Sequence, residues 1–131
     1  MSELQLKTKE AGYAIASLGD LRDFEGKIFV KDVMETTGVE ISFGSLSEGQ
    51  CVPFNHKHKQ NEEVYIIVKG KGVFTLDGKD YEVASGDVIR IAPEVVRTNR
   101  NTGKGVFSYI CIQSKAGSLE QYTMTDGIIL Q

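Results

Sequence analysis

Short runs of β-branched and aromatic residues, separated by glycines, recur along most of the chain. The pattern predicts strands at residues 27–33, 39–45, 63–69, 87–92 and 106–113. A hairpin is predicted at residues 72–83, where the pair Asp77-Gly78 is typical of a two-residue type I′ turn. Helical periodicity is poor, and the best candidate is a single turn at residues 118–123. Many short strands joined by tight turns indicate an all-β fold, either a sandwich or a barrel.

Two of the predicted strands have apolar side chains on both faces. Within 63–69, Glu63, Tyr65 and Ile67 share one face, and the even-numbered residues, all Val or Ile, share the other. Residues 106–113 show a similar two-sided pattern. A closed two-sheet barrel covers one face of each strand, so the other face needs an outer layer. A partner subunit would supply this layer, and the pattern therefore favours a homodimer.

Length and composition place the chain among ordinary globular proteins. Its 131 residues fit one domain, 1–131, with 40% hydrophobic and 25% charged residues. The apolar runs, such as residues 64–68, are far shorter than the roughly 20 residues of a membrane-spanning helix. The N-terminus lacks the apolar region of a secretory signal, and two cysteines do not make a disulfide framework. These features predict a cytoplasmic protein with reduced thiols and no membrane partner.

The charge distribution argues against a nucleic-acid partner. Fifteen basic and eighteen acidic residues are interspersed and give a net charge of −3 at pH 7. A nucleic-acid surface would need a basic stripe. The small cluster of Arg97, Arg100 and Lys104 lies among polar residues, and we interpret it as a solvated turn with one residue of interest.

The chain contains only two histidines, His56 and His58, and they are separated by one residue. On a strand, such residues point to the same side, where two imidazoles can share one ion such as Zn, Fe or Ni. Glu62 and Glu63 follow, and a turn after the histidines would bring one of these carboxylates to the same side. An exposed histidine pair with a weak or vacant metal site is the alternative. The flanking Pro53-Phe54 pair and the long apolar strand after the glutamates favour the metal site.

Two stretches of the chain resemble the motifs of the cupin superfamily. The first contains Gly49, His56, His58, Glu63 and Gly70, and the second contains Gly86, Asp87, Pro93 and Asn101. Together they cover roughly residues 49–101, about two fifths of the chain. The resemblance implies a double-stranded β-helix, or jelly-roll barrel. It also implies that His56, His58 and Glu63 bind a divalent metal, and it selects Glu63 over Glu62 because six residues separate Glu63 from Gly70.

The chain departs from the second motif at Arg97, where the superfamily usually has a third histidine. A guanidinium has no lone pair and cannot be a metal ligand. The remaining two histidines and one carboxylate are a set that can bind Fe, Mn, Ni or Zn. The charge of Arg97 would oppose the metal unless an anion lay between them. That anion is either a substrate carboxylate or phosphate, or Glu94 or Asp87, in which case Arg97 is structural.

These observations predict a small metal-binding cupin that acts on or binds a small anionic ligand. Arg97, Tyr65 and Gln60 are the candidate substrate-binding residues, although Tyr65 also suits a barrel core and Gln60 a turn. If the protein is an enzyme, the resemblance implies a metal-dependent dioxygenase, decarboxylase or sugar isomerase or epimerase. The alternative is a non-enzymatic ligand-binding cupin with a weak or absent metal site.

Overall fold

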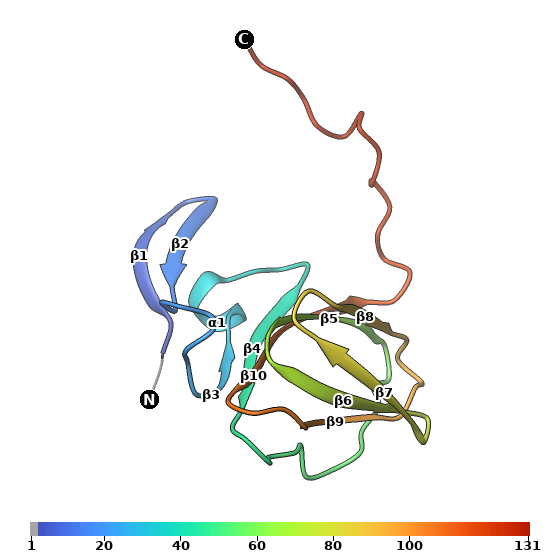
Figure 1. The fold of residues 1–131 in the computed structure, drawn as a ribbon. Coiled ribbons are helices and arrows are strands. Elements are labelled where there is room, and N and C mark those ends of the chain that lie inside the picture. Colours follow the sequence, from blue (N-terminus) through green and yellow to red (C-terminus); the bar gives the residue numbers. More distant parts are fainter. Residues whose placement is uncertain (1–2) are drawn as a thin grey trace.

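The computed structural model describes residues 3–131, and the regular secondary structure of these residues is almost entirely β (Figure 1). The elements in chain order are β1 (Gln5–Glu10), β2 (Tyr13–Ser17), β3 (Gly26–Phe29), α1 (Lys31–Met34), β4 (Glu40–Leu46), β5 (Asn61–Lys69), β6 (Lys71–Leu76), β7 (Lys79–Ala84), β8 (Val88–Ile91), β9 (Arg97–Asn101) and β10 (Phe107–Lys115). The all-β prediction is confirmed. Among the described residues, no helix is long and apolar enough to cross a bilayer.

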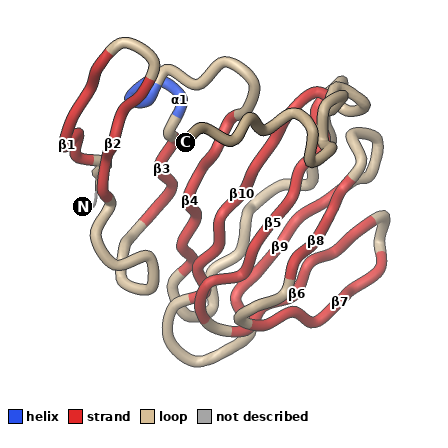
Figure 2. The backbone as a smooth tube through the Cα atoms, turned by 90° about the horizontal axis from the view of Figure 1, so that it is seen from above, coloured by secondary structure: helices blue, strands red, loops and turns tan. Residues whose placement is uncertain are grey.

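Two antiparallel sheets pack face to face and form the body of the protein. One sheet has five strands in the order β3-β4-β10-β5-β8, which lie side by side when seen from above (Figure 2). The other has three strands in the order β7-β6-β9. The β1–β2 hairpin forms a separate two-stranded sheet. Every strand pair is antiparallel.

The side-chain alternation predicted for residues 63–69 is confirmed in β5. Glu63, Tyr65 and Ile67 are buried between the sheets, whereas Val64, Ile66 and Val68 are only partly buried on the other face. The predicted hairpin is also confirmed, because β6 and β7 are joined by Asp77 and Gly78 alone. Their φ angles of 50° and 80° are both positive, as a type I′ turn requires.

Aromatic rings fill the space between the sheets. Tyr65, Phe74, Phe107 and Tyr109 pack in edge-on or tilted pairs, with ring centroids 4.9 to 6.5 Å apart. The remaining members of this buried cluster are Ile67, Ile91 and Cys111. Gly44 allows the close approach of Tyr109, since a Cβ atom at this position would lie 2.5 Å from the Tyr109 ring. The core therefore packs the two sheets against each other, and its strands β5 and β10 carry much of the site described below.

Three local predictions were wrong or incomplete. The strand predicted at 27–33 ends at Phe29, and α1 begins two residues later, where the Lys31 N–H donates to the Glu40 side chain. The helical turn predicted at 118–123 is not formed. A single turn has too few internal hydrogen bonds to persist without packing, and residues 118–123 are exposed. The β1–β2 hairpin was not predicted.

The segment 97–104 is the most informative correction, since its first five residues form β9, an edge strand of the smaller sheet. β9 pairs with β6, and residues Arg97, Asn99 and Asn101 point inward and are buried. Asn101 donates to the backbone oxygens of Leu46 and Gly105 at 3.0 and 2.8 Å. A strand with polar residues on its inner face lacks the apolar alternation by which strands are recognised in sequence. It was therefore interpreted as a turn.

Candidate metal centre

Residues 51–58 run along the free side of β9 as an irregular strand. Val52 donates its N–H to the Asn99 oxygen at 2.9 Å, and isolated β-bridges join Cys51 to Arg100 and His56 to Arg97. The N–H of His58 donates to the Pro93 oxygen at 2.9 Å. Backbone hydrogen bonds therefore hold both histidines in place at one end of the barrel.

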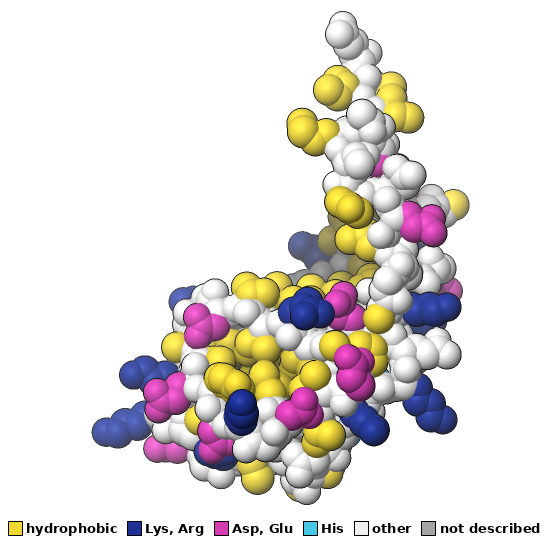
Figure 3. Space-filling model, turned by 90° about the vertical axis from the view of Figure 1, so that its right-hand side faces the viewer, with side chains coloured by type: hydrophobic (Ala, Val, Ile, Leu, Met, Phe, Trp, Pro, Cys, Tyr) yellow, Lys and Arg dark blue, Asp and Glu magenta, His cyan; other side chains and the backbone are white. Residues whose placement is uncertain are grey.

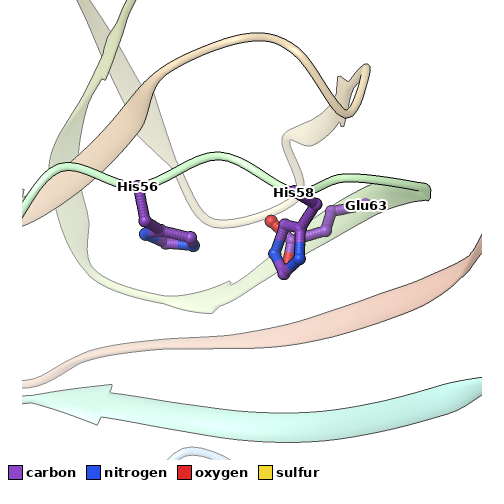
Figure 4. A group of neighbouring side chains, drawn as sticks. All are labelled: His56, His58 and Glu63. Carbon is purple, nitrogen blue, oxygen red and sulfur yellow. The ribbon is translucent and has the colours of Figure 1, made fainter.

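His56, His58 and Glu63 converge at this end (Figure 4). One ligand atom from each of the three side chains lies within 4.8 Å of the other two. The two imidazole centroids are 5.4 Å apart. Glu63 comes from the start of β5 and is 3% exposed, whereas both histidines are partly exposed. The cluster therefore lies where the barrel interior meets solvent.

The donor atoms of this cluster fit a divalent cation. His56 Nδ1 and His58 Nε2 are buried and have no hydrogen-bond partner among the described residues. His58 Nε2 lies 3.2 Å from Glu63 Oε2 but not in hydrogen-bond geometry. Burial lowers the pKa of His56, which favours the neutral imidazole whose lone pair a metal requires. Two imidazoles and a carboxylate are a ligand set suited to Fe, Zn or Ni.

Other side chains hold the Glu63 carboxylate from both sides. The Tyr65 hydroxyl donates to Oε1 at 3.4 Å, and the Cys111 thiol donates to Oε2 at 3.3 Å. Burial raises the pKa of Cys111 to about 12 and also raises the pKa of Tyr65, so both groups stay protonated and remain donors. Cys111 and Tyr65 reach the same carboxylate because they are directly opposite in the β5–β10 ladder.

Arg97 is 1% exposed and lies beside this carboxylate. Its Nε atom is 3.5 Å from Glu63 Oε1, and its Nη2 donates to the Ala92 oxygen at 2.9 Å. Nε and Nη1 have no hydrogen-bond partner within residues 3–131. The carboxylate nearest Arg97 is therefore Glu63. From the sequence, Asp87 and Glu94 were considered as the carboxylates that pair with Arg97. Asp87 instead accepts a hydrogen bond from the Ala84 N–H, and Glu94 is exposed.

The remaining candidate residues lie outside the cluster. Gln60 is exposed just before β5, and its backbone oxygen accepts from the Ala116 N–H. Its predicted role in substrate binding stays a prediction. Glu62 points to the opposite face of β5 and pairs with Arg90 at 3.4 Å. The sequence analysis missed the contact of Cys111 with Glu63. The alternation in 106–113 indicates that the thiol points inward, but it does not specify the register of β10 against β5 that brings the thiol to Glu63.

Comparisons with known proteins agree with this architecture. A crystal structure of a cupin protein from Bacteroides fragilis is 42% identical, covers 92% of this chain and 98% of its own, and superposes with a TM-score of 0.84. An uncharacterised protein of Methanocaldococcus jannaschii is 39% identical over 56 residues, and the oxalate-binding protein of Thermotoga maritima is 33% identical over 57 residues. These two matches cover 43% and 44% of this chain. They span only 45% and 47% of those relatives, less than half of their length.

The double-stranded β-helix implied by the sequence motifs is thus confirmed by a relative of known structure. Residues 43–113, more than half of the chain, match the cupin domain family. The chain therefore belongs to the cupin superfamily.

Proposed function

We propose that this cupin binds a divalent metal through His56, His58 and Glu63, and that metal and Arg97 together bind a small carboxylate-bearing anion. The observation that carries the proposal is the buried guanidinium of Arg97, which has two nitrogens without hydrogen-bond partners among the described residues and borders the cluster. Buried polar groups in proteins are normally hydrogen-bonded. A bound anion would supply the missing acceptors.

Electrostatics favours an anion between the metal and Arg97. Two unit charges 4 Å apart interact by about 4 kcal/mol at an effective dielectric constant of about 20, and a divalent ion doubles the charge. Glu63 offsets part of this repulsion, since its carboxylate lies 3.2 Å from His58 and 3.5 Å from Arg97. An anion that contacts both cations would offset more of it. Metal and anion should therefore bind cooperatively.

A carboxylate is the anion that suits this arrangement best. The planar guanidinium matches the two oxygens of a carboxylate, and a second carboxyl group could contact the metal. The name of the Thermotoga maritima relative, an oxalate-binding protein, supports a small dicarboxylate as the first ligand to test. When bound, the metal would polarise the ligand or activate oxygen. The fold does not choose among dioxygenase, decarboxylase and isomerase or epimerase chemistry.

Within this proposal the residues of the chain have separate roles. Tyr65 and Cys111 hold the Glu63 carboxylate through their hydrogen bonds and act as positioning residues. Arg97 binds and orients the anion. Gln60, exposed next to the cluster in sequence, remains a candidate contact for a larger ligand.

Titration calorimetry with oxalate tests the proposal. We expect oxalate to bind more tightly to protein loaded with Mn²⁺ or Zn²⁺ than to metal-free protein. Arg97→Gln should weaken oxalate binding by at least about tenfold, because charge-assisted bidentate pairs are among the stronger hydrogen bonds. Arg90→Gln is the matched control, since Arg90 lies on the outside and pairs with Glu62. Oxalate affinity that depended on neither metal nor Arg97 would contradict the proposal.

A ligand-binding cupin without a resident metal is the second candidate. It is favoured by the charge balance of the metal-free cluster, in which Glu63 already pairs with Arg97 and lies beside His58. In this case oxalate would bind the metal-free protein as tightly as the loaded protein, and Arg97→Gln alone would abolish binding. The same calorimetry therefore separates the two candidates.

A further inference from the structure

An apolar groove opens between the two sheets on one side of the barrel. β7 and β8 are edge strands of different sheets, and within residues 3–131 no ladder joins them. The side chains on their inner faces therefore border an open groove of about 560 Å³. Its apolar lining includes Leu76, Tyr81, Val83, Ile89, Ile91 and Val95. Apolar side chains gather on this side of the molecule, and charged side chains border them (Figure 3).

The groove has the size and the lining of a site for a small organic molecule. Ligand pockets commonly enclose roughly 300–1,000 Å³ and are mainly apolar. Phe74 and Tyr81 both line the groove, and they pair directly in the β6–β7 ladder, so their rings project from the same face. Aromatic rings pack favourably against other rings in edge-on or offset arrangements. The lining therefore favours an aromatic group as the occupant.

The inner end of the groove adjoins the candidate metal centre. Leu76 pairs directly with Arg97 in the β6–β9 ladder. Ile91 pairs directly with Glu63 in the β5–β8 ladder. Paired side chains share one face of a sheet and lie next to each other. The Arg97 guanidinium also donates to the oxygen of Ala92, which directly follows β8. The apolar groove and the charged site are thus neighbours inside one barrel.

We propose that the ligand of this protein is a small carboxylate that carries an aromatic ring, with the carboxylate at Arg97 and the ring in the groove. This inference rests on the proposed function, since it assigns the apolar part of the same ligand. Nε and Nη1 of Arg97 are buried without acceptors among the described residues, and they supply the charge that complements a carboxylate. Oxalate has no group to place in the groove. An aromatic ring would remove the apolar lining from water.

Titration calorimetry of the Zn²⁺-loaded protein with phenyllactate and lactate tests the inference, because these two ligands differ by one phenyl ring. We expect phenyllactate to bind at least about tenfold more tightly than lactate, through burial of the ring. Val83→Trp fills the groove from β7 and should remove most of this difference, while lactate affinity stays the same. Val106→Trp is the matched control, since Val106 is also partly buried but does not line the groove.

A second variant guards against misfolding of Val83→Trp. Tyr81 is 48% exposed, so Tyr81→Ala should fold, which circular dichroism checks. It removes one aromatic wall of the groove and should weaken phenyllactate binding several-fold without affecting lactate. Arg97→Gln should weaken the binding of both ligands.

The inference and the proposed function fail in different ways. Equal affinities for phenyllactate and lactate overturn the inference, as does phenyllactate binding that Val83→Trp and Tyr81→Ala leave unchanged. Phenyllactate binding that does not depend on Arg97 also overturns it, because the carboxylate would then lie elsewhere. A phenyllactate affinity that falls as protein concentration rises overturns it too, since a second copy would then fill the groove. In each case, oxalate binding that needs both metal and Arg97 would leave the proposed function standing.

Discussion

His56 and Arg97 lie directly opposite each other and exchange both backbone hydrogen bonds, at 3.1 Å from His56 to Arg97 and 2.9 Å in return. Directly paired residues project their side chains to the same face, so this pair places a permanent positive charge beside a candidate metal ligand. Burial is the main cause that lowers the pKa of His56; the Glu63 carboxylate acts in the opposite direction, and the charge of Arg97 adds to the lowering. Arg97 thus favours the neutral imidazole and at the same time opposes a bound cation. The two effects of Arg97 can be separated by substitution.

Removing a proposed ligand should abolish metal binding. We expect the metal content of the His58→Ala and Glu63→Gln variants to fall well below one ion per chain, because two ligands hold an ion far more weakly than three. Lys57→Ala is the control, since Lys57 lies between the histidines and is exposed. Elemental analysis of protein purified without a metal-affinity tag, before and after loading with Fe, Mn, Ni or Zn, gives the metal content. Wild-type content in His58→Ala would exclude this ligand set.

Replacing Arg97 by histidine should tighten metal binding. The substitution removes a fixed charge and adds a lone pair at the position bridged to His56. Arg97→Gln removes the charge without adding a strong ligand, so its affinity should lie between those of the wild type and Arg97→His. Competition with a chromogenic chelator measures the three dissociation constants. Equal affinities in all three proteins would show that Arg97 does not limit metal binding.

The two thiols should differ in reactivity. Cys51 is exposed, whereas Cys111 is buried and its pKa is raised to about 12, so little thiolate forms at Cys111 near neutral pH. We expect a thiol reagent at pH 8 to modify one cysteine in the native protein and both after denaturation. Cys51→Ser should then show no reactive thiol in the native state. Rapid native modification of Cys111 would mean that the barrel end opens to the reagent.

The same raised pKa makes stability sensitive to alkali. The thiol ionises near 9.0 in the unfolded chain but only near 12 in the folded protein, so between these values the folded state binds more protons. The free energy of unfolding should therefore fall as pH rises from 9 toward 12, by up to about 1.4 kcal/mol per pH unit from this group. Cys111→Ala should show a shallower decline in urea titrations. An identical pH dependence in both proteins would contradict the assignment.

Gly44 should tolerate no side chain. It faces Tyr109 across the β4–β10 ladder, where an added Cβ atom would meet the ring at 2.5 Å. We expect Gly44→Ala to lower the free energy of unfolding by about 1–3 kcal/mol, the usual cost of overpacking a core. Gly38→Ala is the control, because nothing lies within 4 Å of its added Cβ atom. Urea denaturation of both variants compares them directly.

The sequence by itself determined the features that depend on neighbouring residues. Alternation required that only one of Glu62 and Glu63 point inward, because successive side chains of a strand point to opposite faces, and the motif resemblance selected Glu63. Asp77-Gly78 determined the β6–β7 turn, since few residue pairs adopt two positive φ angles. The spacing of His56 and His58 likewise placed both imidazoles on one side.

Only the tertiary structure decided which distant residues meet. The motif resemblance placed Arg97 near the metal, but its segment was interpreted as a solvated turn because the strand carries polar residues on its inner face, the reverse of the usual pattern. The contact of Arg97 with Glu63, 34 positions away in the sequence, depends on how the two sheets face each other. The contact between Glu63 and Cys111, 48 positions apart, depends on the register of β5 against β10. The exposure of the apolar side chains in residues 119–130 also appeared only in the tertiary structure. Register and burial arise from the packing of whole sheets, and no local run of residues specifies them.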